Sequence, residues 1–472
     1  MVRVIRSMSA FAASVLLAIL CVACEVEERP ASPPASAPVE DPPIIAPVTP
    51  ASAPASAPAQ TRPVPEAYAQ NGIEIGVVSD REQLLPGPWA QADFGDWRIA
   101  NDEFEVIIAG LDADPEQRPS MGIIDIARKA DPYDDLSQIE PIFYIGDNAE
   151  ALTLSDVAIR REDTPALTFS GAATNNKNIQ ATLTYELDSD PRVLRLTTML
   201  TNASTETLHN VALGERVQWG VYVPFIEGFG LPDPALVEVT RSSWVGGWID
   251  NNSLGLVARE GMIEATHTMS VTLNRYENMH AMKPGDQLSV TRSLFIGDKD
   301  FSNFTDYALQ LRETPATDVT GRVLELESNQ PVANAPIRVE TYLKASLQAA
   351  DPSELPVPLP YTLTQTDSDG VFRFNAPVGM RVYPQLHDPT REGPTGALIY
   401  EAMAGQTLDV GEIRTKAQTR LALEVVDDAT SKSLPCKIQI NHVSGPIADY
   451  GPPFQAQRSE ERRVGKECRS RW

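Results

Sequence analysis

At 472 residues, the chain is long enough for about three domains of ordinary size. Its hydrophobic residues (42%) and charged residues (22%) occur in the proportions of a globular protein. The formal net charge of -25 is spread along the whole chain. It excludes nucleic acid and anionic lipid surfaces as the main partner, because both would repel the protein.

The first segment, residues 1–23, is predicted to be a bacterial export signal. Arg3 and Arg6 give it a positive start, and the apolar run Phe11–Val22 that follows is too short for a membrane-spanning helix. Cys24 comes directly after a small residue, and this boundary resembles a lipoprotein signal box, in which the cysteine takes the lipid. The resemblance implies a lipid anchor at Cys24 and a place in the cell envelope, periplasmic or on the outer surface. An ordinary cleaved signal is the alternative.

Residues 24–70 are predicted to form a disordered tether. Ala, Ser and Pro alternate here, and 12 of the 39 prolines of the chain lie between Pro30 and Pro65. This composition offers too little apolar surface to offset chain entropy and favours extended polyproline II. Forty such residues at ~3.1 Å each reach on the order of 100 Å, which suits a spacer between a membrane and a folded part.

Residues 71–300 are predicted to form a large antiparallel β-sandwich. Apolar and polar residues alternate with a period of two, most clearly over Ile179–Leu187, which indicates strands with one buried face. Further strands are predicted at Phe104–Ile108, Val193–Thr201, Val211–Val223, Leu254–Val257, His267–Leu273 and Leu288–Ile296. Eight or more strands without a long helix predict an all-β fold.

Two smaller β-sandwich units are predicted after a connecting helix. The helix is expected over residues 301–314, because Ser302 can cap it and the side chains of Phe304, Ala308 and Leu311 then share one face. The first small unit covers residues 315–415. The second begins at residue 416, repeats the same opening and is cut at residue 457.

The first small unit carries three motifs in a fixed order. They are VTGRV at Val319–Val323, PVANAPIRV at Pro331–Val339, and TDSDGVFRF at Thr366–Phe374. These motifs resemble the carboxypeptidase regulatory-like domain, a small seven-stranded sandwich of the transthyretin kind. The Pro-rich insertion at Ala345–Leu359 departs from that pattern.

Residues 458–472 resemble a conceptual translation of a sequencing adapter. We therefore expect Cys468 to lie outside the natural protein and the natural chain to continue past Gln457. Besides Cys24, Cys436 is then the cysteine that remains in the mature segment, and it is predicted to be a small buried strand residue. No disulfide framework is expected, although the envelope is oxidising.

No motif in the sequence indicates a catalytic residue or a metal site. The five histidines lie far apart, and the signatures of nucleophile elbows, phosphate loops and dinucleotide sites are absent. No cofactor is therefore expected in this segment. His267 falls among apolar strand residues and is predicted to belong to the core. The acidic stretches Asp112–Glu116 and Asp367–Gly370 supply too few oxygens for calcium, and a solvated loop and a turn are predicted instead.

The most suggestive binding residues are aromatic and lie beside glycines. Trp219, Tyr222 and Phe225 precede a Gly-Phe-Gly run, and Trp244 and Trp248 flank two glycines. Flat rings can stack on a sugar or a peptide, so these five side chains are the predicted ligand-binding site, for a carbohydrate or an envelope protein. Core packing combined with turns is the alternative interpretation.

A wider resemblance covers residues 72–457. It is carried by Asp96–Phe104, Gly122–Asp125, Leu213–Gly220, Pro284–Asp286 and Arg292–Asp298. These motifs look like the N-terminal region of envelope PHP-type metallohydrolases of the CehA/McbA kind. The resemblance implies a galactose-mutarotase-like sandwich, then carboxypeptidase regulatory-like modules, then a metal-dependent PHP barrel beyond Gln457. The H-x-H motif and the later metal ligands of that family match nothing here.

Three functional hypotheses follow. In the first, the chain is a lipid-tethered, non-catalytic array of β-sandwiches that binds carbohydrate or another envelope partner. In the second, it is the accessory half of a metal-dependent PHP-type hydrolase whose catalytic domain is missing from this segment. The third is an aldose epimerase, which needs a paired acid and base, with His267 and either Glu215 or Glu227 as the candidates.

Overall fold

The computed structural model describes residues 65–417, with gaps at 112–121, 137, 146–147, 163, 175, 228–237, 250, 268–269, 277–279, 342–358, 389 and 393–398. The expected signal, Cys24, most of the tether, nearly all of the second small unit, residues 112–116 and the last fifteen residues lie outside the described residues. Pro63–Ala417 forms one compact unit, so the domain boundaries expected within it stay predictions.

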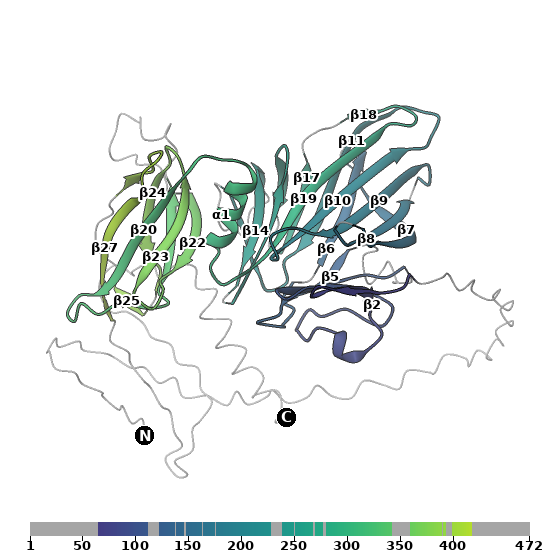
Figure 1. Ribbon diagram of the computed structural model, residues 1–472. Helices are drawn as coiled ribbons and strands as arrows, with labels where there is room; N and C mark the ends of the chain where they lie inside the picture. The colour runs from purple at the N-terminus through teal and green to yellow at the C-terminus, as the bar shows by residue number, and fades with distance from the viewer. Residues whose placement is uncertain are drawn as a thin grey trace, which may run out of the picture. The chain divides into compact units, whose positions relative to one another are not determined.

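Strands β1 to β19 form one 19-stranded sheet that doubles over into two antiparallel layers (Figure 1). The layers are joined by β7, which pairs first with β6 and then with β8. Sheet I consists of β1 (Tyr68–Gln70), β2 (Ile73–Val77), β3 (Trp97–Ala100), β4 (Phe104–Ile108), β5 (Ile123–Arg128), β6 (Gln138–Ile145), β11 (Leu208–Gln218), β13 (Glu238–Ser242), β16 (Ile263–His267), β17 (Val271–Tyr276) and β18 (His280–Met282). Sheet II consists of β7 (Asn148–Arg160), β8 (Ala166–Ala173), β9 (Ile179–Leu187), β10 (Val193–Asn202), β12 (Val223–Ile226), β14 (Trp244–Trp248), β15 (Asn252–Ala258) and β19 (Gln287–Asp298). The predicted all-β sandwich is confirmed.

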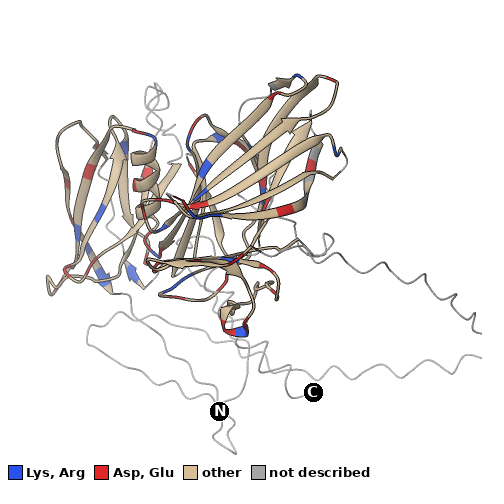
Figure 2. Ribbon diagram, turned by 45° about the vertical axis from the view of Figure 1, so that its right-hand side comes forward, with Lys and Arg blue, Asp and Glu red and all other residues tan. Residues whose placement is uncertain are grey.

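The core lies between the two layers. Alternate residues of β9 are buried and the residues between them are half-buried or exposed, as the period-two pattern predicts. Inward-facing apolar side chains of both sheets belong to one continuous hydrophobic cluster, which includes Phe104, Phe143, Leu196 and Leu254. Charged residues are scattered over the strands and loops of the described chain (Figure 2).

Two predicted strands differ from the observed ones: one is too long, and the other is a hairpin. The strand expected over Val211–Val223 stops at Gln218, because the N–H of Tyr222 donates to the carbonyl oxygen of Trp219 (2.9 Å) and closes a turn. Gly220 in this turn has a φ of 61°, which glycine adopts without strain. The strand expected over His267–Leu273 is a hairpin instead, since β16 ends at His267 and β17 begins at Val271.

Helix α1 (Ser302–Leu311) confirms the predicted helix, but its start differs from the prediction. Phe301 occupies the N-cap position and makes no side-chain capping bond. Ser302 is instead the first helical residue, and both its N–H (3.0 Å) and its hydroxyl (2.6 Å) donate to Oδ1 of Asp300. The Asp300 carboxylate therefore performs the role that was assigned to Ser302. No helix in the described part of the chain is long and apolar enough to span a membrane.

The apolar face of α1 packs against sheet II. Phe304 and Ala308 are buried and Leu311 is half-buried, which is the predicted face. A Cβ atom on Gly255 of β15 would lie 2.0 Å from the Phe304 ring, so the absence of a side chain there lets the helix approach. The other side of α1 contacts β22 and β23, and the hydroxyl groups of Thr305 and Thr362 lie 2.9 Å apart.

A small β-sandwich follows α1 and consists of two four-stranded sheets, in the orders β23-β20-β27-β25 and β22-β21-β24-β26. Its strands are β20 (Ala316–Glu325), β21 (Pro336–Thr341), β22 (Leu359–Gln365), β23 (Val371–Pro377), β24 (Arg381–Leu386), β25 (Arg391–Glu392), β26 (Tyr400–Glu401) and β27 (Leu408–Ala417). Val323, Ile337, Val339, Phe372 and Phe374 contribute to its separate core. The second, smaller sandwich of the predicted fold class is confirmed.

The acidic stretch before β23 forms a turn. Oδ1 of Asp367 accepts hydrogen bonds from the N–H groups of Asp369 and Val371, both at 2.9 Å. Gly370 has a φ of 74°, which such a turn requires. The carboxylate is therefore engaged by the backbone, in agreement with the turn interpretation.

Candidate functional site

The five predicted ligand-binding aromatic residues lie in packed regions of the large sandwich. Trp219, Tyr222, Phe225 and Trp244 are buried, and Trp248 is half-buried. The rings of Phe225 and Trp244 stack with an interplanar angle of 7° and centroids 6.2 Å apart. The indole N–H of Trp219 donates to the Thr272 hydroxyl (2.8 Å), and that of Trp248 donates to a backbone carbonyl (2.9 Å).

The glycines beside these rings allow close packing. A Cβ atom on Gly246 would lie 2.9 Å from the Phe301 ring, and one on Gly247 would lie 2.6 Å from the Trp219 ring. Such contacts leave no room for a side chain. Burial and close packing favour the core-packing interpretation of these residues, and their ligand-binding role stays a prediction.

The candidate acid and bases of an epimerase are held by structural contacts. The ring nitrogens of His267 lie 3.1 Å from the Thr240 hydroxyl and 3.2 Å from the Thr272 hydroxyl, and burial lowers the pKa of His267 to about 4. His267 is therefore neutral at pH 7. Glu227 accepts hydrogen bonds from the N–H (2.8 Å) and the hydroxyl (2.7 Å) of Ser243.

The third candidate, Glu215, belongs to an ion pair between the two sheets. Its carboxylate on β11 pairs with the Arg292 guanidinium on β19, and both side chains are almost completely buried. The Tyr276 hydroxyl donates to the same carboxylate (2.6 Å), while Arg292 donates to the Thr198 hydroxyl (2.6 Å). This arrangement cross-links sheet I to sheet II and satisfies charges that would otherwise be buried without partners.

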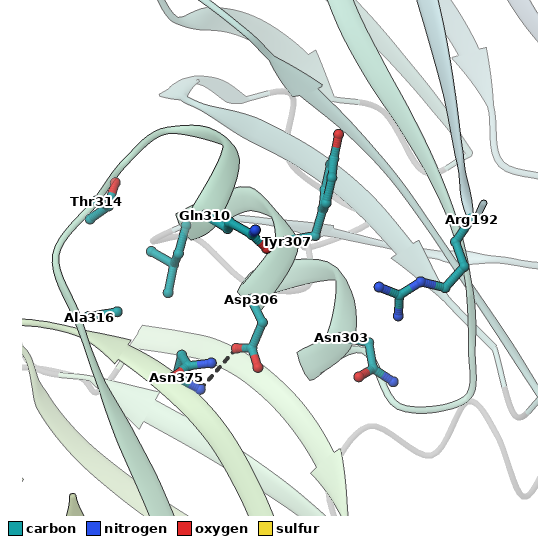
Figure 3. Close-up of a pocket in the computed structure, with 9 residues that line it drawn as sticks. Arg192, Asn303, Asp306, Tyr307, Gln310, Thr314, Ala316 and Asn375 are labelled. Atoms are coloured by element: carbon teal, nitrogen blue, oxygen red, sulfur yellow. Dashed lines mark hydrogen bonds between the residues drawn. The ribbon is translucent and has the colours of Figure 1, made fainter. Parts of the chain in front are cut away.

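A cavity of about 310 Å³ lies beside α1 (Figure 3). Most of its lining residues are polar. They come from α1, from the segment between α1 and the start of β20, from Arg192 directly before β10, and from β23. The polar side chains around it include Arg192, Asn303, Asp306, Tyr307, Gln310 and Asn375. The sequence analysis missed this cavity, because its lining residues come from three stretches that are far apart in the chain.

One sequence signal could have indicated the cavity. Asn303, Asp306 and Gln310 are spaced by three and four residues, so they share the polar face of the predicted helix. The apolar face is accounted for by core packing. A polar face made of amide and carboxylate groups is what a hydrogen-bonding site needs.

The two charged groups of the cavity, Arg192 and Asp306, differ in their partners and in the direction and cause of their pKa shifts. Arg192 donates to Asp190 through Nε (3.0 Å) and through a terminal nitrogen (2.8 Å), and this pairing raises the pKa of Arg192. Its guanidinium also lies 4.9 Å from the centre of the Phe295 ring. Asp306 points to Asn375, whose N–H it accepts (2.9 Å), and burial raises the pKa of Asp306 to about 6 (Figure 3).

Metal binding finds no support in the described residues. Within them, no group of three or more His, Cys, Asp and Glu side chains is arranged to hold a metal ion. The lining of the cavity supplies three carboxamides, a threonine hydroxyl, one carboxylate and a paired guanidinium. Such groups can exchange hydrogen bonds with a hydroxyl-rich ligand.

No model of a known protein family matches the sequence, and no curated protein is recognisably similar to it. Similar solved structures include a galactose mutarotase-like protein from Lactobacillus casei ATCC 334, with 12% identity, a TM-score of 0.32 and coverage of 43% of this chain and 100% of that chain. A putative aldose 1-epimerase from Escherichia coli K12 shows 8% identity and a TM-score of 0.27, covering 42% of this chain and 97% of that chain. An α-galactosidase of family GH36 from Geobacillus stearothermophilus shows 11% identity and a TM-score of 0.31, covering 50% of this chain and 43% of that chain. These scores are low, and the β-sandwich assignment rests on the strand pairing of the chain itself.

Proposed function

We propose that this chain is a lipid-tethered protein of the cell envelope whose β-sandwich modules bind a carbohydrate and do not act on it chemically. The cavity beside α1 carries the binding part of this proposal. Its volume of about 310 Å³ is at the small end of the range for ligand pockets, which suits a ligand the size of one sugar ring. Asn303, Gln310 and Asn375 offer donors and acceptors for hydroxyl groups.

The charges around the cavity favour a neutral ligand over an anionic one. The Arg192 guanidinium is already neutralised by two hydrogen bonds to Asp190. Asp306, with a pKa of about 6, is mostly ionised at pH 7. A phosphate or a carboxylate would therefore meet no unpaired cation there, whereas a sugar needs none.

Binding of sugars to the purified chain tests this proposal. Isothermal titration with neutral hexoses, N-acetylated hexosamines and their short oligomers is expected to show saturable binding by at least one of them. Asn303→Ala and Asp306→Asn should weaken that binding by about tenfold, because the first removes a hydrogen-bonding side chain and the second replaces one carboxylate acceptor with an NH2 donor. Gln287→Ala, which truncates an exposed amide on β19, is the matched control and should leave binding unchanged.

Two outcomes would overturn the proposed site. If no sugar binds, the carbohydrate class is wrong. If a sugar binds equally well to Asn303→Ala and Asp306→Asn, the class is right but the cavity is not the site. Circular dichroism and thermal unfolding of each variant separate a local effect from a loss of fold.

The tether is tested independently. In cells, the chain is expected in the membrane fraction, and mass spectrometry of its N-terminal peptide should show a lipid on Cys24. Cys24→Ser should move the chain to the soluble fraction, because one polar side chain then replaces the anchor. An unlipidated chain that fractionates as soluble would contradict this part of the proposal.

The accessory-half hypothesis is a separate proposal and rests on the motif resemblance. Long-read sequencing of the source DNA across the codon for Gln457 tests it. A reading frame that continues into an H-x-H motif with further His and Asp ligands would make the modules described here the accessory region of a hydrolase. A frame that stops soon afterwards, or that continues only into further β-sandwiches, would contradict the accessory-half hypothesis and leave carbohydrate binding as the proposed function.

A further inference from the structure

Three aromatic side chains are exposed on two neighbouring loops of the large sandwich. Trp89 is 39% exposed, Phe94 is 60% exposed and Tyr133 is 52% exposed. They are the aromatic members of the exposed large hydrophobic residues in the described chain; the others are aliphatic and lie elsewhere, namely Val239, Leu326, Val378, Ile399 and Met403. Aromatic surface that faces water has a cost, so a group of such residues indicates contact with a partner.

The loop that carries Trp89 and Phe94 is held firmly on the outer face of sheet I. It runs from β2 through the short 3-10 helix η1 (Arg81–Gln83) to β3, and it lies alongside β2 and β5 in Figure 1. Val78 and Leu85 pack against Ile107 and Ile124 in a small apolar cluster beneath it. The loop therefore has a core of its own under the exposed rings.

Buried carboxylates fix the backbone on both sides of these rings. Asp125 accepts the N–H groups of Gln91 (2.7 Å) and Ala92 (3.1 Å), which follow Trp89 by two and three residues. Asp96 accepts the N–H group of Asp93 (2.7 Å), next to Phe94 in the chain, and that of Gly110 (2.8 Å). Hydrogen bonds to charged acceptors are the stronger kind, so the loop conformation is set before any partner arrives.

The segment that carries Tyr133 is joined to the same loop. The N–H of Asp134 donates to the carbonyl oxygen of Pro86 (2.8 Å). A Cβ atom on Gly87 would lie 2.1 Å from the carbonyl oxygen of Asp134, so the two backbones are in direct contact. Trp89 and Tyr133 therefore stand on adjoining, mutually braced segments.

The surroundings of the rings restrict the partner. Residues 79–96 and 131–136 contain seven Asp and Glu residues, of which Asp134 is protonated at pH 7, and a single basic residue, Arg81. This charge disfavours polyanions. The exposed aliphatic residues lie on other segments, whereas a protein interface needs a contiguous apolar centre. Separate flat rings among polar groups fit the apolar faces of successive sugar rings.

We propose that Trp89, Phe94 and Tyr133 form an aromatic platform for a neutral polysaccharide, separate from the cavity beside α1. The platform takes a chain of sugar rings on an open surface, whereas the cavity takes a single ring. Because the two sites share no residue, variants of one leave the other intact, and the failure of one proposal is distinguishable from the failure of the other.

Retention of the full chain on polysaccharides tests the platform. The probes are insoluble cellulose and chitin, soluble neutral β-glucan in affinity gels, and alginate as the anionic comparison. At least one neutral polysaccharide should retain the chain and alginate should not. Trp89→Ala, Phe94→Ala and Tyr133→Ala should each weaken retention about five- to tenfold, and the triple variant should abolish it.

Two control variants show whether retention depends on the aromatic rings themselves. Leu326→Ala removes an apolar side chain of the same exposure as Tyr133 from another segment, and it should change nothing. Trp89→Tyr keeps a ring and should restore most of the retention. Equal retention of the triple variant, equal binding to alginate, or no retention on any neutral polysaccharide would each overturn the proposal. A photo-crosslinker at position 89 that captures a defined protein, without polysaccharide binding, would identify a protein interface instead.

Discussion

Two regions of the large sandwich share the same composition of aromatic residues and glycines, yet they differ in exposure. In the first region the rings of Trp219, Tyr222, Phe225, Trp244 and Trp248 are buried or half-buried, and a Cβ atom on Gly247 would collide with Trp219. In the loop that holds Trp89 and Phe94 the rings face water, and a Cβ atom on Gly95 would meet nothing within 4 Å. Gly246 and Gly247 make room for rings in the first region, whereas Gly95, with a φ of 96°, permits a turn in the second. Composition alone therefore does not distinguish a core from a surface.

The largest effect is expected from removing a ring in the buried region. Trp244→Ala should lower the free energy of unfolding by about 3–5 kcal/mol, because it leaves a cavity against Phe225, Phe301 and Phe304. Urea unfolding followed by circular dichroism measures the loss. A loss below about 1 kcal/mol would mean that the ring is not part of a packed core.

The second-largest loss of stability is expected from breaking the ion pair between Glu215 and Arg292, which joins the two sheets. Glu215→Gln should cost about 3 kcal/mol, because Arg292 then stays buried without a counter-charge. The double variant Glu215→Leu with Arg292→Met should recover much of that loss, since no charge is then left in the interior. A double variant less stable than Glu215→Gln would contradict this account.

The loop region depends on buried carboxylates, so its stability should vary with pH. Burial and the neighbouring charge of Asp125 raise the pKa of Asp134 from 3.8 to about 9. A carboxyl group with a raised pKa stabilises the fold fully below its unfolded value and loses that contribution as pH rises to the folded value. The free energy of unfolding should therefore fall by up to about 1.4 kcal/mol per pH unit within this range.

Asp134→Asn removes this dependence. The variant should be more stable than the parent near neutral pH, and the difference should grow from about pH 5 to about pH 8 in urea unfolding. Its Oδ1 can still accept the N–H of Ile126, which Asp134 accepts at 2.9 Å. Parallel pH profiles for the two proteins would show that Asp134 is ionised in the folded state.

The smallest effect on stability is expected from the exposed rings. Trp89→Ala and Tyr133→Ala should each change the free energy of unfolding by less than about 0.5 kcal/mol, because neither side chain fills a core. The contrast with Trp244→Ala is the direct test of the comparison. A loss for Trp89→Ala similar to that for Trp244→Ala would show that the loop ring is structural.

Regular alternation made parts of the fold predictable. The strand Ile179–Leu187 has the predicted ends, because its apolar residues are buried in alternation and turns flank it. Phe104–Ile108 also has the predicted ends, although all of its residues are buried. Alternation failed at β17, where the residues that turn inward are Thr272, Asn274 and Tyr276 and the apolar ones between them are only half-buried. A buried polar network, which includes the indole of Trp219, reverses the expected phase.

The candidate sites were not predictable in the same way. The cavity needs Arg192 from the residue before β10, Asp306 from α1 and Asn375 from β23. A sequence pattern does not show that these three segments lie side by side. The cross-sheet pair of Glu215 and Arg292 also depends on two layers facing each other. The sequence indicates the polar face of α1, but it does not indicate that Arg192 and Asn375 lie next to that face.

The pairing of β10 with β19 has a consequence for folding speed. The hydroxyl groups of Thr197 and Thr291, which meet across these strands 3.1 Å apart, are separated by 94 residues of chain. Such distant pairing is typical of a fold with high contact order, because the chain loses loop-closure entropy before the contacts between the strands form. β proteins of this kind fold in milliseconds to seconds. Sheet II cannot be completed until residue 298 is available. Until then, the edge of β10 that pairs with β19 has no partner strand.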